Sequence, residues 1–196
     1  MNLGWQAQFD HIVLPAWASY LDAENALSKS YEVGRGELIE AAQYRALREG
    51  GCVSFYLNHY ADIIANERPP QLPQDAGTVR DVRAWVASNC RYLRAGEPID
   101  DVQLLADVAD ALKHAKLTRR PDERQVEAND AVLVAGLGWG EGPFGEGKFG
   151  GGDQVLVLAK SGTRVLSAIL QNVFDAWRVS MEWPLPPISV VFLIDE

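Results

Sequence analysis

The chain has 196 residues, of which 47% are hydrophobic and 23% charged, and its formal net charge is −9. This composition excludes an intrinsically disordered chain, and the negative charge argues against general coating of nucleic acid. The longest nearly continuous apolar run, residues 188–194, is far shorter than the roughly 20 residues of a membrane-spanning helix. The N-terminus lacks the basic start and apolar run of a secretory signal, so we expect a cytoplasmic protein without membrane contact.

Most of the first 120 residues show the spacing of apolar side chains that is typical of helices. We predict four of them, over residues 6–31, 37–67, 77–92 and 100–116. Pro15 predicts a kink near residue 14, and Gly50-Gly51 predicts a bend or a tight helix contact. The apolar side chains expected to be buried on the second helix are Leu38, Ala41, Ala42, Leu47, Phe55, Tyr56, Tyr60 and Ile63. Short connections favour an antiparallel bundle.

The pattern changes after Pro121. Residues 126–135 and 154–159 are predicted strands joined as a hairpin, and a turn at residues 160–162 leads into a helix. The apolar face of that helix is the best defined in the chain: Val165, Leu166, Ile169, Leu170, Val173, Phe174 and Trp177. A last strand is predicted over residues 188–194. We therefore expect an α+β fold in which a helical bundle (residues 1–120) packs with a β-hairpin, helix and terminal strand (residues 121–196) as one globular unit.

The segment between the predicted hairpin strands, Gly136 to Gly152, contains nine of the 17 glycines. It includes G-x-G-x-x-G and G-x-x-x-x-G-K patterns, but a strand follows where a nucleotide-binding loop needs a helix. We therefore expect no cofactor. Its aromatic rings are Trp139, Phe144 and Phe149. Either these rings pin a connecting loop to the body, or they are exposed anchors for a partner.

The end of the fourth predicted helix carries the best chemical candidates. Asp107, Asp110 and His114 are spaced i, i+3 and i+7, so they share one helix face. A carboxylate beside His114 would leave one ring nitrogen free for proton transfer; the alternative is a polar stripe that faces water, with His114 at the helix C-terminus. A basic patch follows and would bind an anion or be a solvated loop: Lys113, Lys116, Arg119, Arg120 and Arg124.

Neither a metal site nor a disulfide is expected. The three histidines, His11, His59 and His114, are far apart in the sequence, and a metal site would need them to converge in space. Cys52 and Cys90 have no metal-like spacing, so we expect buried free thiols in a reducing compartment.

Four helices with the stretch Ala109-Asp110-Ala111-Leu112-Lys113-His114 on the fourth resemble the HEPN superfamily. Its members are helical bundles, often dimers, found in toxin–antitoxin, phage-defence and RNA-processing systems. The ribonuclease motif of the family is an Arg directly followed by a polar residue, with a His a few positions later. Asp110 matches the polar residue and His114 the His, but Ala109 replaces the Arg that would stabilise charge on the phosphate. The resemblance covers residues 1–120 and implies a HEPN-like bundle without its catalytic arginine.

Two hypotheses follow from the sequence. The first is a non-enzymatic interaction module of bacterial or prophage origin, which binds a protein partner or itself through the aromatic-glycine segment or a bundle face. The second is a metal-independent endoribonuclease. In it His114 is the general acid/base, Asp110 orients the ring, and phosphate is held by Lys113, Lys116, Arg119 or Arg120.

Overall fold

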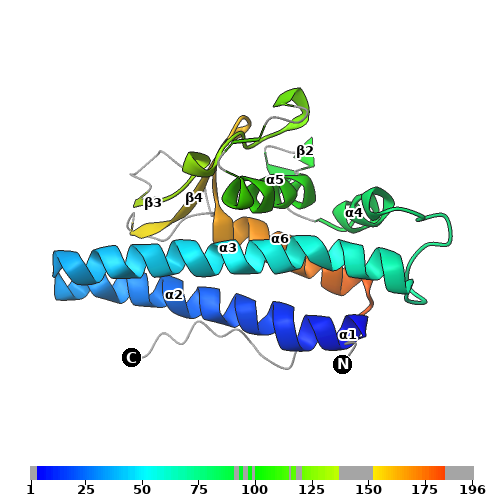
Figure 1. The fold of residues 1–196 in the computed structure, drawn as a ribbon, viewed down its shortest axis with the longest axis horizontal. Helices are drawn as coiled ribbons and strands as arrows, with labels where there is room; N and C mark the ends of the chain where they lie inside the picture. The colour runs from blue at the N-terminus through cyan, green and yellow to red at the C-terminus, as the bar shows by residue number, and fades with distance from the viewer. Residues whose placement is uncertain are drawn as a thin grey trace.

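Two long antiparallel helices form the frame of the molecule, α2 (Leu14–Val33) and α3 (Gly36–Glu67) (Figure 1). The computed structural model describes residues 4–90, 93–94, 97–98, 100–114, 116–117, 121–136 and 152–183. Gly34 makes the tight turn between the two helices with φ 69°, a left-handed conformation that a side chain would strain.

The first predicted helix is irregular close to Pro15. Helix α1 (Trp5–Gln8) runs into a π-helical turn, η1 (Phe9–Val13), and α2 begins at Leu14. Pro15 has no N–H to donate to the carbonyl of His11, so the regular α pattern cannot continue through it. The wider π-turn accommodates this missing hydrogen bond, and the irregularity predicted near residue 14 lies just before it.

Helix α3 confirms the predicted tight contact at Gly50. A Cβ atom there would lie 2.8 Å from Cδ2 of Leu166 and 3.1 Å from Cε2 of Tyr20. Tyr60 is buried as predicted, but the prediction of burial is wrong for Leu38, Ala41, Phe55 and Tyr56, which are exposed. The inner face of α3 is formed instead by Val53, Leu57, Tyr60, Ala61 and Ile64.

The next two helices are shorter than predicted. Helix α4 (Val79–Ala87) begins at a capping box between Thr78 and Asp81, whose hydrogen bonds also lower the pKa of Asp81. A short antiparallel pair, β1 (Leu93–Arg94) and β2 (Glu97–Pro98), separates it from α5 (Asp101–Lys113). At the start of α5 the Asp100 carboxylate accepts a hydrogen bond from the backbone N–H of Gln103 (2.9 Å).

The sheet has three antiparallel strands in the order β3 (Val132–Gly136), β4 (Asp153–Ala159) and β5 (Gly162–Val165). The predicted hairpin is confirmed, but 3₁₀ turns at η2 (Pro121–Glu123) and η3 (Asn129–Ala131) precede β3, which therefore starts later than predicted. Strand β5 differs from the prediction, which places residue 162 in a turn and Val165 on the following helix. The predicted last strand, residues 188–194, lies outside the described residues.

Two carboxylates, one of them buried, tie the sheet to the long helices. The Glu24 carboxylate accepts hydrogen bonds from the Tyr20 hydroxyl (2.9 Å) and from the backbone N–H of Val155 on β4 (3.1 Å). Burial, and then the charge of Glu24, raise the pKa of Tyr20 well above its ordinary value. At the start of β4, Asp153 accepts hydrogen bonds from the Tyr31 hydroxyl and from Nε2 of Gln43.

Helix α6 (Leu166–Ser180) completes the core, and every side chain of its predicted apolar face is buried. The N-terminus of α5 is fixed to β5 and α6 by buried polar groups: Asp101 accepts two hydrogen bonds from Arg164 (2.8 and 3.2 Å) and one from Asn172 (2.7 Å). One cluster of buried hydrophobic side chains joins the helices to the sheet. The fold is α+β, with a small antiparallel sheet beside helices and a helix after it.

Candidate functional site

The last turns of α5 were predicted to carry catalytic carboxylates, and the structure shows what these groups bind. Asp107 is fully buried. Its carboxylate accepts hydrogen bonds from Nη1 of Arg124 (2.8 Å), Nε2 of Gln103 (2.9 Å) and the backbone N–H of Gln125 (2.7 Å). With this many donors a buried carboxylate is well stabilised. Asp107 thus fixes the segment after η2 to α5.

Asp110 binds the same arginine: its carboxylate accepts a hydrogen bond from Nη1 of Arg124 at 2.7 Å. Burial lowers the pKa of Arg124, but the hydrogen bonds and charges of Asp107 and Asp110 outweigh burial and raise it. Arg124 therefore stays charged between two carboxylates, and the three groups together carry one negative charge. This arrangement disfavours a polyanion at this position.

His114 is the C-terminal cap of α5. Its backbone is extended (φ −126°, ψ 127°), and its N–H donates to the carbonyl of Asp110 at 2.9 Å. The side chain is exposed, as is that of Lys113, and it forms no hydrogen bond or ion pair with the residues that the structure describes. The predicted partner, the Asp110 carboxylate, is bound by Arg124 instead.

Other predicted site residues are placed apart or not described. His59 lies on α3, where its Nδ1 is 3.1 Å from the Asp62 carboxylate. Within the described ranges, no three His, Cys, Asp or Glu side chains are grouped so that they could hold a metal ion. The residues that lie outside the described part of the chain are Arg119, Arg120, Trp139, Phe144 and Phe149.

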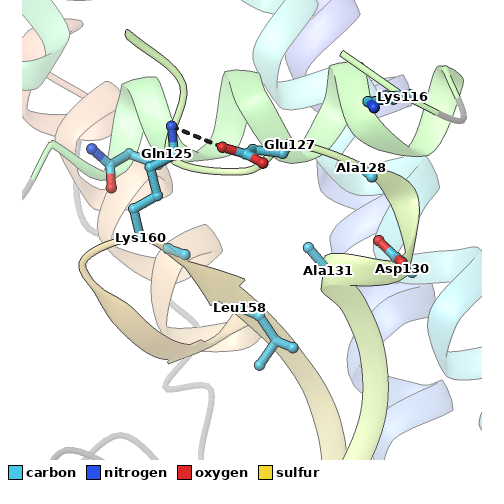
Figure 2. A pocket seen from close by; sticks show the side chains of 9 residues that line it. Lys116, Gln125, Glu127, Ala128, Asp130, Ala131, Leu158 and Lys160 are labelled. Carbon is cyan, nitrogen blue, oxygen red and sulfur yellow. Dashed lines mark ion pairs between the residues drawn. The ribbon is translucent and has the colours of Figure 1, made fainter. Parts of the chain in front are cut away.

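Lys116, a predicted anion-binding residue, lines an open hollow of about 520 Å³ (Figure 2). Lys116 and Lys160 lie on opposite sides of this hollow, and the half-exposed Leu158 of β4 lies along its lower side in this view. Glu127 forms an ion pair with Lys160 (3.0 Å). The full lining is Lys116, Gln125, Glu127, Ala128, Asp130, Ala131, Leu158, Ala159 and Lys160. Two cations face two carboxylates here, so the hollow has no net charge to attract an anion.

The exposed side of α3 is the other candidate. Arg45, Arg48, Cys52, Phe55, His59 and Asp62, hereafter the α3 stripe, recur at three- and four-residue steps and lie along one side of the helix. Phe55 is 39% exposed and the adjacent Tyr56 is 41% exposed. The Phe55 ring packs on the His59 ring, with centroids 4.3 Å apart, and on the Tyr56 ring at 5.9 Å. Side chains from one helix thus form an aromatic cluster on the surface.

The sequence analysis missed the α3 stripe because it assigned Phe55 and Tyr56 to the core. A signal was present. Val53, Leu57, Tyr60 and Ile64 already form a complete inner face, and at about 100° per residue Phe55 falls on the far side of the helix from them. A helix that is apolar on both sides either is buried all round or carries a contact surface.

Comparison with known proteins found no family model, curated protein or solved structure that matches this chain. The resemblance of residues 1–120 to HEPN bundles therefore remains a prediction. None of the described helices has the length and apolar character needed to cross a membrane.

Proposed function

We propose that the protein is a non-catalytic interaction module that binds a protein partner through the α3 stripe and the adjacent Tyr56. The observation that carries this proposal is the aromatic cluster of Phe55, Tyr56 and His59 on the outer side of α3. Exposed aromatic side chains lose apolar hydration when a partner covers them, and they dominate the binding energy of many protein interfaces. A HEPN-like bundle without the catalytic arginine would fit such a role.

The surroundings of the aromatic cluster also suit a protein partner. Its flanks carry both signs of charge, Arg45 and Arg48 toward the helix N-terminus and Asp62 toward the C-terminus. An apolar centre with a charged rim is the usual anatomy of a protein–protein interface. A nucleic acid would instead require an excess of cations.

The double substitution Phe55→Ser/Tyr56→Ser tests the proposal. Both side chains are exposed, so we expect the variant to fold with a free energy of unfolding within about 1 kcal/mol of the wild type. We expect it to lose the covalent adducts that chemical cross-linking produces in cells that express the wild-type protein. The matched control is Val33→Ser, which changes a 60% exposed apolar side chain outside the α3 stripe. Equal adducts for the double variant would contradict the proposal.

The endoribonuclease hypothesis predicts that the protein cleaves single-stranded RNA and that cleavage depends on His114. Its support is that His114, Lys113 and Lys116 are all exposed near the end of α5. Because Asp107 and Asp110 bind Arg124, we expect the purified protein to leave single-stranded RNA intact. Cleavage by the wild type that His114→Ala abolishes would replace the interaction module with a nuclease.

A further inference from the structure

We infer that the hollow lined by Lys116 and Lys160, hereafter the sheet hollow, binds a free α-amino acid with an apolar side chain. The inference goes beyond the proposed function, because this second site includes no residue of the α3 stripe. It follows from a gap in the sheet, from two backbone groups that the gap leaves unpaired and from the charges around them.

The gap opens where β3 and β4 diverge. The register of the two strands ends with Val132 opposite Val157, so the next pair would be Ala131 opposite Leu158. Instead, Ala131 belongs to the 3₁₀ turn η3, and its N–H donates to the carbonyl of Ala128 (3.2 Å). Figure 2 shows the two chains separating, with Leu158 on one side and Ala131 on the other. The sheet hollow of about 520 Å³ lies between them.

The backbone N–H and C=O of Leu158 point into this gap. Successive residues of a strand point these groups to alternate sides. The N–H of Val155 donates to the Glu24 carboxylate (3.1 Å) rather than to β3, so Leu158, three residues later, points toward β3. The N–H of Lys160 donates to the carbonyl of Gln125 at the far end of the hollow (2.9 Å), which gives the same side for Leu158. In the part of the chain that the structure describes, neither group has a backbone partner across the gap.

A free α-amino acid supplies the missing partner. In the closely spaced pair of an antiparallel sheet, the residue opposite uses its own N–H and C=O, which are joined through one Cα atom. An α-amino acid carries its ammonium and carboxylate groups on one carbon atom in the same way. Its ammonium group would donate to the C=O of Leu158, and its carboxylate would accept from the N–H. Both hydrogen bonds involve a charged group, which makes them stronger than the bonds of an ordinary strand pair.

The charges of the sheet hollow suit a zwitterion. Glu127 and Lys160 already bind each other (3.0 Å). Lys116 and Asp130 are exposed, and neither side chain forms an ion pair with the residues that the structure describes. They leave one cation for the carboxylate of the ligand and one carboxylate for its ammonium group. A ligand with a single charge would be attracted by one of these side chains and repelled by the other.

The size and the apolar part of the lining favour an apolar side chain on the ligand. The volume of the hollow lies within the roughly 300–1,000 Å³ of small-molecule sites. The Leu158 side chain is 45% exposed, and three alanines also line the hollow: Ala128, Ala131 and Ala159. Because the hollow is open, we expect weak binding, with a dissociation constant for L-leucine on the order of 0.1–1 mM.

An NMR titration of the purified full chain with L-leucine tests the inference. We expect the amide resonances of Leu158 and Ala159 to shift and to saturate. Two probes each lack one charged group of leucine: isocaproate has no ammonium group, and isoamylamine has no carboxylate. Each should bind at least about tenfold more weakly than leucine, because it forms only one of the two charged hydrogen bonds.

Variants of the two unpaired side chains locate the site. Lys116→Gln and Asp130→Asn should each weaken leucine binding about fivefold or more, and both positions are exposed, so the fold should be retained. The matched controls are Lys29→Gln and Asp22→Asn, which remove the same charges from exposed positions on α2 outside the lining. They should bind leucine like the wild type.

Three results would overturn the inference: no shift at Leu158 with leucine up to about 20 mM, binding of either singly charged probe as tight as that of leucine, or equal binding by the Lys116 and Asp130 variants and their controls. Binding of an uncharged, terminally blocked tripeptide in the absence of leucine binding would show that the sheet hollow accepts a chain segment, and it would reject the amino acid as ligand.

Discussion

At the scale of single residues, Asp107 and Arg124 illustrate how a polar cluster that looks catalytic in sequence can have a structural role. Asp107 is fully buried and is held by an arginine, an amide side chain and a backbone N–H. Removal of one partner from a buried ion pair costs much more than removal of an exposed one, because the remaining charge is left in a poorly solvated place.

We therefore expect Arg124→Met to lower the free energy of unfolding by about 2–4 kcal/mol. This loss is smaller than the loss expected for a fully buried ion pair, because the Arg124 side chain is 20% exposed. The matched control is Glu127→Gln, which removes a charge from the exposed ion pair with Lys160 and should cost less than about 1 kcal/mol. Urea denaturation of both variants measures the difference. Equal losses would show that the cluster of Asp107, Asp110 and Arg124 does not support the fold.

The two thiols differ in how far they are buried. The expectation that both are buried is wrong for Cys52, which is exposed. Burial, and then the charges of Asp101 and Asp100, raise the pKa of Cys90 to about 12. At pH 8 a disulfide reagent should therefore modify one thiol quickly and the other slowly, and Cys52→Ser should remove the fast phase.

The raised pKa of Cys90 also predicts a dependence of stability on pH. Above the ordinary thiol pKa of 9.0 the unfolded chain releases the Cys90 proton, whereas the folded chain keeps it up to about pH 12. The free energy of unfolding should therefore fall as the pH rises through this window. A Cys90→Ala variant should show a smaller fall. Identical pH profiles for the two proteins would contradict this assignment.

At the scale of elements, α3 is shaped by opposite demands on its two sides. The inner side needs Gly50, because Tyr20 of α2 and Leu166 of α6 both pack against the backbone there. The outer side carries the aromatic cluster. Helix propensity alone would favour alanine at position 50 by about 1 kcal/mol, so the tight contact must outweigh it.

Gly50→Ala should therefore destabilise the protein by about 1–3 kcal/mol net, since both neighbours are buried and cannot move freely. Gly36→Ala is the matched control: it changes a glycine of the same helix with nothing within 4 Å of the added atom, and we expect it to be neutral or slightly stabilising. Thermal unfolding measures both. A stabilising Gly50→Ala would show that the two helices can separate at little cost.

Elements were predictable where one periodic signal dominated. The helices over α2, α3 and α6 and the β3–β4 hairpin follow from their apolar patterns, and Asp100 and Gly50 mark a cap and a contact. Strand β5 was missed because its four residues, Gly162–Val165, are too few to show a period. The end of α4 was missed because no proline or glycine directly follows Ala87 to mark it.

At the scale of the whole molecule, the sequence identified the residues that could do chemistry but not their surroundings. The spacing of Asp107, Asp110 and His114 is compatible with a catalytic face. However, Arg124, which lies just after η2, binds both carboxylates. Phe55 of the α3 stripe was predicted to be buried and is exposed. The spacing of Val53, Leu57 and Ile64 indicates the inner side of α3, and the packing of α2, α5 and α6 against α3 shows that it is inside.

The most direct test of the α3 stripe as a contact surface is photo-cross-linking from a benzoylphenylalanine placed at position 55 of the full chain, in cells that express it. Position 29 on α2, where Lys29 is exposed outside the α3 stripe, carries the same group as the control. We predict a discrete protein adduct from position 55 and none from position 29. No adduct from position 55, or equal adducts from both positions, would contradict the account.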